Sequence, residues 1–165
     1  MQEIRLNRAW YRPEHLAFRE TVQRFVTREI TPHVNEWDEA GTFPRELYRK
    51  AAEVGLLGIG FPEEYGGVGN VDYFHRLIAS VELAQCGAGG VLASLMSHTI
   101  GAPPVAAVGS TELKARVLPA VLAGERIAAL AITEPSGGSD VSALRTRAER
   151  DGDHYIVNGE KTFIT

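Results

Sequence analysis

The sequence is short of several features that would each assign it to a special class of protein. It has one cysteine, Cys86, so no disulfide can form within the chain, and no set of cysteines and histidines has the spacing of a zinc site. Its 17 basic and 21 acidic side chains give a net charge of −4, which provides no general attraction for nucleic-acid phosphates. These shortages disfavour a disulfide scaffold and a basic DNA-binding protein, and they favour a reducing compartment.

Long hydrophobic runs are also lacking. Residues 83–111 contain no Asp, Glu, Lys or Arg, but glycines and prolines interrupt them, whereas a membrane-spanning helix needs ~20 mostly apolar residues in one stretch. The buried helices of a globular bundle explain this region better. The first 15 residues have no apolar signal-peptide core and include acidic residues, which transit peptides avoid, so we expect a cytoplasmic protein without membrane insertion.

What is present is an ordinary globular composition, with 44% hydrophobic and 23% charged residues among 165. Apolar residues recur with a helical period in the first two thirds of the chain. An amphipathic helix is predicted from Pro13 to about Trp37, with a kink or restart at Pro32. Four further helices are predicted at about 44–55, 71–84, 88–99 and 110–122, with Gly55 ending the first of these and Ser110 capping the last.

At Gly124 the helical period gives way to a strand period. Residues 127–132 have the length and apolar character of a covered strand. The segments TRAER, HYIV and KTFIT follow, separated by Asp151-Gly152 and Asn158-Gly159, dipeptides typical of two-residue hairpin turns, so we predict a three-stranded antiparallel meander. The predicted fold class is α+β: an all-α helical bundle domain over 1–124, then the beginning of an antiparallel β-barrel domain over 125–165.

The loop Thr133–Ser139 joins strand to strand in this prediction. It therefore does not open a helix as a Rossmann phosphate loop does, and it lacks the Lys-Ser/Thr pair of a P-loop. Gly137 and Gly138 would let backbone amides approach a flat or anionic ligand, and Thr133 and Ser139 flank them with hydroxyls. The alternative, a tight structural turn without a ligand, is the commoner role of such a loop.

Two segments carry a family resemblance. AITEPSGGSDVSA, residues 131–143, resembles the signature segment of the acyl-CoA dehydrogenase family, and YIVNGEKTFIT, residues 155–165, resembles its second hallmark at the expected separation. The loop FPEEYGGVG and the helix end LPAVLAGE are also similar to the family's N-terminal all-α domain. The resemblance implies that 125–165 are the first strands of the family's middle β-domain, and that the family's C-terminal helical bundle is absent from this chain.

The resemblance also implies a flavin site for FAD. Members of the family oxidise an acyl-CoA thioester to the trans-2-enoyl-CoA. By the resemblance, the cofactor-binding residues here are Leu130, Ala131, Ile132, Thr133, Gly138, Ser139, Phe163, Ile164 and Thr165. Phe163 would pack on the isoalloxazine face, and Thr165 would lie near flavin N5. Ser139 would also contact the pantetheine arm of CoA, and Ala93, Met96 and Ile100 would line the acyl tunnel, although apolar residues at that spacing are usually core.

The family's catalytic base is a glutamate from the C-terminal half, expected here beyond Thr165. The resemblance gives Glu134 a structural role in the loop instead. An electron-transferring flavoprotein partner and a homo-oligomer, tetramer or dimer, follow from the family. We expect no metal site: Asp72 and His75 have the spacing of half a di-iron site, but a second such pair is missing, and the five histidines are expected in solvated or locally hydrogen-bonded positions.

Two alternatives stay open at this point. Flavin oxidases and monooxygenases share the fold, and no residue up to Thr165 separates them from dehydrogenases. A non-catalytic helical module that binds acyl-CoA or a protein partner is the third hypothesis, and it would bind no flavin.

Overall fold

The computed structural model describes residues 10–69 and 71–165. Residues 1–9 and Asn70 lie outside this described part. The prediction against a signal sequence depends largely on residues 1–9, and Asn70 belongs to the predicted loop. Two compact units divide the chain: a helical unit that ends at Ala128 and a second unit, Ala129–Thr165. We describe each unit by itself.

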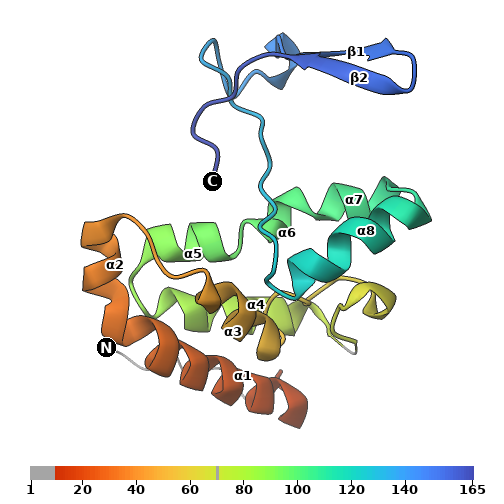
Figure 1. Cartoon of the computed structure of the whole chain (residues 1–165). Helices are drawn as coiled ribbons and strands as arrows, with labels where there is room; N and C mark the ends of the chain where they lie inside the picture. Colours follow the sequence, from red (N-terminus) through yellow and green to blue (C-terminus); the bar gives the residue numbers. More distant parts are fainter. Residues whose placement is uncertain (1–9, 70) are drawn as a thin grey trace. The chain divides into compact units, whose positions relative to one another are not determined.

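Eight α-helices are described in the helical unit, with π- or 3-10-helical turns between some of them (Figure 1). The α-helices are α1 (Pro13–Phe25), α2 (Val34–Ala40), α3 (Glu46–Glu53), α4 (Tyr73–Ala84), α5 (Gly89–Leu95), α6 (His98–Gly101), α7 (Pro103–Val108) and α8 (Thr111–Leu122). The π-helical turn is η1 (Val26–Ile30), and the 3-10 turns are η2 (Thr31–His33) and η3 (Glu63–Tyr65).

The sequence explains where several of these helices begin and end. The predicted restart at Pro32 is confirmed, because α1 ends before η1 and α2 begins after η2. Gly55 follows the C-cap Val54 of α3 and adopts φ +80, the left-handed conformation that stops a helix. Ser110 caps α8 through its hydroxyl, which accepts the Leu113 N–H at 3.1 Å. The predicted helix 88–99 is wrong in its C-terminal part, since α5 ends at Leu95 and the short α6 follows.

Two apolar clusters form the core of the helical unit. The larger cluster joins α1, η1, α3, α4 and α5, and its fully buried members are Val22, Ile30, Ala51, Leu56 and Leu95. The smaller cluster packs Phe61 and Tyr65 against α8. Figure 1 shows α1 alongside α4, and Arg19 of α1 donates to the buried Glu82 of α4 at 2.6 Å. The α1 stripe predicted from the sequence is therefore the face that builds this core.

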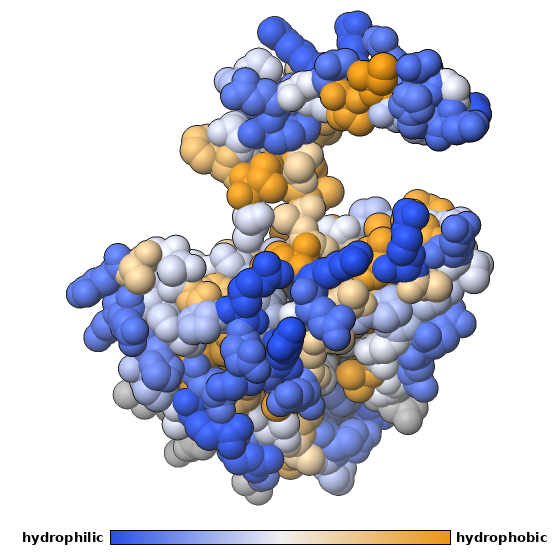
Figure 2. Space-filling view, viewed as in Figure 1, coloured by the Kyte–Doolittle hydropathy of each residue, from blue (hydrophilic) through white to orange (hydrophobic). Residues whose placement is uncertain are grey.

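The second unit contains the 3-10 turn η4 (Val141–Ala143) and one hairpin, β1 (Arg147–Asp151) paired antiparallel with β2 (His154–Asn158). Gly152 and Asp153 form its two-residue turn, one residue later than predicted, and Gly152 alone has positive φ. Both strands are exposed along their length. In Figure 2, apolar surface lies among the hydrophilic side chains of this unit.

Two of the predicted strands do not form. Residues 127–132 pair with no strand among the described residues, and Ile127 and Leu130 are exposed rather than covered. The predicted strand KTFIT does not form because Phe163 has φ +56, which no β-strand residue adopts. The predicted turn at Asn158-Gly159 does not fold the chain back onto β2: Arg147 pairs with Asn158, and Gly159 continues past the hairpin beside Thr146, where a Cβ would collide.

A loop glycine provides a test of the helical unit's packing. A Cβ on Gly67 would collide with the backbone carbonyl of Phe61, whereas a Cβ on Gly89, the first residue of α5, would meet nothing within 4 Å. We expect Gly67→Ala to lower the free energy of unfolding by about 1–3 kcal/mol, because the backbone must move to admit the methyl group.

Gly89→Ala is the matched control and should leave stability unchanged or slightly raised, since alanine favours a helix. Both changes can be measured by urea unfolding followed through tryptophan fluorescence, as Trp10 and Trp37 are the two tryptophans and both precede Ala128. Equal unfolding midpoints for the two variants would contradict the packing at Gly67.

Candidate functional site

A tight turn shapes the loop that the sequence marked as a ligand-binding candidate. Glu134 and Gly137 exchange two backbone hydrogen bonds, of 2.9 and 3.0 Å, so Pro135 and Ser136 form the tip of the turn. A Cβ on Gly137 would meet nothing within 4 Å, so this side of the turn is open. The loop is therefore rigid at its base and accessible at its outer side.

The carboxylate of Glu134 holds the base of this turn. It accepts hydrogen bonds from the Thr146 hydroxyl (2.6 Å), the Arg145 and Thr146 N–H groups (2.7 and 3.0 Å) and Lys161 Nζ (2.9 Å). The Thr146 hydroxyl, then the two backbone donors and Lys161, lower the pKa of Glu134 to about 2, although burial opposes this. A general base needs an accessible lone pair and a pKa near the working pH. Glu134 is therefore a structural anchor, as the resemblance implies.

The second motif is bound directly to the first. Lys161 Nζ donates to the Ile132 carbonyl at 2.8 Å, and the Thr162 N–H donates to the Thr133 carbonyl at 3.0 Å. Three consecutive residues of the first motif thus have acceptors turned toward Lys161 and Thr162. The two segments that the sequence analysis singled out form one continuous site.

The predicted cofactor-binding residues lie on these two adjoining segments. Within the described part of the chain, the N–H groups of Gly138 and Ser139 have no hydrogen-bond acceptor. Phe163 is 95% exposed in a left-handed backbone conformation that is rare for a bulky residue. Ile132, Thr133 and Gly138 are partly buried, and the remaining members are exposed: Leu130, Ala131, Ser139, Ile164 and Thr165. The site thus combines free N–H donors, hydroxyls and an exposed aromatic ring.

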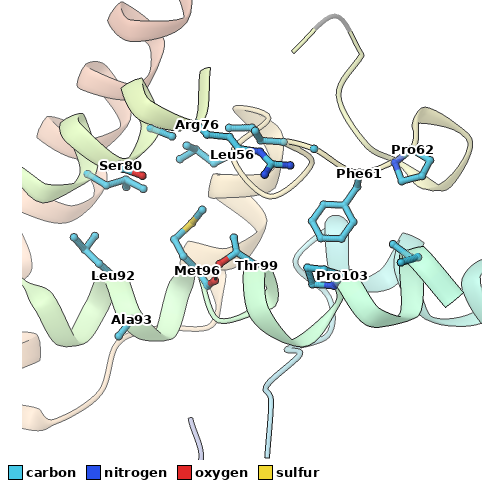
Figure 3. Close-up of a pocket in the computed structure, with 16 residues that line it drawn as sticks. Leu56, Phe61, Pro62, Arg76, Ser80, Leu92, Ala93, Met96, Thr99 and Pro103 are labelled. Atoms are coloured by element: carbon cyan, nitrogen blue, oxygen red, sulfur yellow. Dashed lines mark hydrogen bonds between the residues drawn. The ribbon is translucent and has the colours of Figure 1, made fainter. Parts of the chain in front are cut away.

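The helical unit contains a largely apolar pocket of about 810 Å³ (Figure 3). α4 contributes Arg76, Ser80 and Leu83, and the opposite wall runs from α5 to α7. Figure 3 shows the Met96 side chain projecting from the end of α5 toward Leu56. The pocket is large enough to hold an extended aliphatic chain, and Arg76, Ser80 and Thr99 supply its polar groups.

Of the three predicted tunnel residues, the structure places two on this pocket. Ala93 and Met96 line it, whereas Ile100 does not and is 62% exposed. The prediction assumed one helix from 88 to 99. Because α5 ends at Leu95 and α6 begins at His98, the helical phase changes between Met96 and Ile100, and a spacing of four residues no longer keeps them on one face.

A second polar cluster joins the starts of α1 and α4. His15 and His75 are both buried, and they approach Asp72 so that one ligand atom from each residue lies within 4.8 Å of the others. The expectation of solvated or locally hydrogen-bonded histidines holds for the local contacts of both rings, but His15 also contacts Asp72, which lies 57 positions away in the chain. Each histidine closes a capping box, because His15 Nδ1 accepts the Arg12 N–H at 3.0 Å and His75 Nδ1 lies 3.2 Å from the Asp72 nitrogen.

The donor chemistry of this cluster does not fit a metal. Since His15 Nδ1 accepts a hydrogen bond, its proton lies on Nε2, which faces Asp72 Oδ1 at 3.1 Å and has no lone pair for an ion. A metal-bound histidine needs the opposite arrangement, with a proton on the outer nitrogen. Arg12 Nη2 also binds Asp72 Oδ2 at 2.7 Å and would repel a cation. The cluster therefore fits a capping network better than a metal centre.

Comparison with known families matches both units. The model of the acyl-CoA dehydrogenase N-terminal domain matches residues 12–125, and that of the acyl-CoA dehydrogenase middle domain matches residues 129–165. The chain belongs to the acyl-CoA dehydrogenase family. The mostly helical N-terminal part and the short antiparallel sheet after it agree with the fold of this family.

Individual acyl-CoA dehydrogenases agree along most of the chain. The mitochondrial long-chain specific acyl-CoA dehydrogenase of Sus scrofa is 43% identical over 152 residues, covering 92% of this chain and 35% of that protein. The crystal structure of acyl-CoA dehydrogenase from Geobacillus kaustophilus is 40% identical with a TM-score of 0.86, covering 94% of this chain and 40% of that one. Glutaryl-CoA dehydrogenase from Mycobacterium smegmatis in complex with FADH2 is 31% identical with a TM-score of 0.86, covering 96% and 40%. The chain thus spans well under half the length of these relatives.

Prediction from the sequence missed two residues, Lys161 and Thr146, whose hydrogen bonds to Glu134 help to join the two motifs. Lys161 lies inside the second hallmark, so the resemblance marked its segment without assigning the side chain a role. Thr146 lies twelve positions after Glu134, and no local pattern connects the two. The family resemblance found the segments, and the structure shows which side chains join them.

The capping network makes a pH prediction. Burial opposes ionisation of Asp72, but hydrogen bonds from His75 and His15 outweigh it and lower its pKa from 3.8 to about 2. The ionised carboxylate therefore stabilises the helical unit fully above about pH 3.8, and this contribution is lost as the pH falls through about 2. Asp72→Asn, which keeps a capping oxygen but has no charge, should lower stability at neutral pH and flatten the acid dependence.

Urea unfolding midpoints measured between pH 2 and 7 would check this expectation. Asp38→Asn removes the same charge from an exposed position on α2 and should keep the wild-type pH dependence. The capping network would be refuted if the curves of Asp72→Asn and wild type ran parallel throughout this range.

Proposed function

We propose that this chain forms the flavin-contacting N-terminal part of an FAD-dependent acyl-CoA dehydrogenase, which converts an acyl-CoA thioester into the trans-2-enoyl-CoA. The observation that carries the proposal is the joined pair of motifs in the second unit. Acceptors of the first motif take hydrogen bonds from Lys161 and Thr162 of the second. The N–H groups of Gly138 and Ser139 have no acceptor among the described residues, and the Phe163 ring is exposed. Family membership and the flavin-containing relative support it.

The residues present suit a flavin. The exposed ring of Phe163 offers a flat apolar surface for an aromatic cofactor and excludes water from it. The backbone N–H groups and the Thr133 and Thr165 hydroxyls can donate to ring heteroatoms, with Leu130, Ala131 and Ile132 beside them and Ile164 next to Phe163. FAD, when bound, supplies hydride acceptance from the substrate β-carbon. Fixed donors stabilise the negative charge that this acceptance creates, because they need no reorganisation.

The substrate proposal uses the helical unit as well. An acyl chain would occupy the pocket lined by Ala93 and Met96, and Ser139 would contact the pantetheine arm of CoA. The α-proton must leave to a base, and Glu134 is unsuitable because its hydrogen bonds hold it ionised with a pKa of about 2. By family membership we assign the base to a glutamate outside residues 1–165, an electron-transferring flavoprotein as the acceptor, and a homo-oligomer as the working form.

The full-length protein tests this proposal directly. It should bind FAD, lose the visible absorbance of the oxidised flavin when an acyl-CoA is added without oxygen, and pass electrons to an electron-transferring flavoprotein or an artificial acceptor. Fast reoxidation by oxygen with peroxide release would instead show an oxidase. A protein that takes up no flavin would show a non-catalytic module.

The pocket predicts how chain-length preference is controlled. Met96→Ala enlarges the pocket by removing a flexible side chain from its wall, so longer acyl chains should gain kcat/KM relative to shorter ones. About tenfold is expected, because one methylene in an apolar pocket is worth about 1–3 kcal/mol. A series of saturated acyl-CoA substrates measures this ratio.

Val108→Ala is the matched control, since Val108 is 86% exposed on α7 and does not line the pocket. Ile100→Ala distinguishes the tunnel predicted from the sequence, which includes Ile100, from the described pocket, which does not. A shift in chain-length preference for Ile100→Ala, with none for Met96→Ala, would show that the described pocket is not the acyl site.

A further inference from the structure

The ammonium group of Lys161 lies between two acceptors of the first motif. Its Nζ is 2.8 Å from the Ile132 carbonyl and 2.9 Å from Glu134 Oε1, and the side chain is only 23% exposed. Both partners are strong acceptors, and charge-assisted hydrogen bonds of this kind are roughly twice as strong as neutral ones. Lys161 is also the only lysine after residue 128 in the sequence. No other ammonium in the second unit can replace it.

This contact fixes the backbone on both sides of the site. In the first motif, Lys161 orients the Ile132 carbonyl and the Glu134 carboxylate. Thr133 is therefore held between two anchored residues. In the second motif, Lys161 and Thr162 are both bonded to the first motif directly before Phe163. Phe163 adopts φ +56, and a bulky residue keeps such a conformation only when its surroundings determine it.

We propose that Lys161, through its ion pair with Glu134, is the positioning residue of the flavin site: it sets the orientation of Thr133 and of the Phe163 ring toward the cofactor. The inference rests on the proposed function, because it concerns the ligand that these two residues contact. Neither Lys161 nor Glu134 exchanges a proton with the substrate in this scheme. The low pKa of Glu134 supports it, since the carboxylate stays ionised and paired throughout the physiological range.

The test replaces Lys161 by methionine, which keeps the length of the side chain and removes the ammonium. In the full-length protein, Lys161→Met should raise the dissociation constant of FAD about tenfold or more, because two hydrogen bonds to a charged donor are lost. At saturating FAD, the bound flavin should also have a shifted visible absorption band and a changed midpoint potential. A purely structural role would weaken binding but leave the spectrum and potential of the bound flavin at wild-type values.

Arg147→Met is the matched control. It removes one positive charge from an exposed position on β1, and it should leave the affinity, spectrum and potential unchanged. If Lys161→Met does not fold, Lys161→Arg replaces it, because a planar guanidinium keeps the charge but cannot place one nitrogen between the same two acceptors. A folded Lys161→Arg protein is expected to raise the dissociation constant about threefold or more and to shift the flavin band.

Wild-type affinity and spectrum in whichever variant folds would overturn the inference, as would weaker binding with a wild-type spectrum and potential at saturation. The proposed function is tested separately by the wild-type protein. Failure of the wild type to bind FAD rejects the function itself, whereas a wild type that binds FAD together with unaffected variants rejects only the role of Lys161.

Discussion

The hydrogen bonds that end on the Glu134 carboxylate hold together segments that are far apart in the second unit's sequence. Arg145 and Thr146 approach it from the connection before β1, and Lys161 approaches from beyond β2. A buried carboxylate is costly unless every strong acceptor site is filled, and here four donors fill it. Because the hairpin is exposed on both strands and contributes little apolar burial, this polar centre, rather than a hydrophobic core, determines how the two motifs meet.

The helical unit has the opposite construction, with polar contacts that orient an apolar core. Asp72 caps α4 and binds residues at the start of α1, while Arg19 and Glu82 connect the same two helices further along. These contacts fix the position of α4, and α4 supplies one wall of the apolar pocket. The opposite wall runs from α5 to α7, where the chain changes direction between short helices. Capping and pocket shape are thus linked through α4.

How much the sequence could predict follows from how local each interaction is. The restart at Pro32, the helix end at Gly55 and the helix start at Ser110 depend on residues within a few positions, and all three were predictable. The failures concern partners that lie far away in the chain. Residues 127–132 have the composition of a strand but no partner strand among the described residues, and Lys161 is bonded to residues 27 and 29 positions before it rather than to β2. Neither periodicity nor turn propensity contains that information, and only the family resemblance brought the two motifs together.

The distribution of donors and acceptors gives the motif loop a chemical preference. The carbonyls of Ile132, Thr133 and Glu134 are all used within the site, by Lys161, Thr162 and Gly137. The N–H groups of Gly138 and Ser139 have no acceptor in the described part of the chain. A loop with two free backbone N–H donors is suited to a ligand that carries or gains negative charge. An aromatic ring beside those donors adds a requirement for a flat ligand surface, and a flavin that becomes reduced meets both requirements.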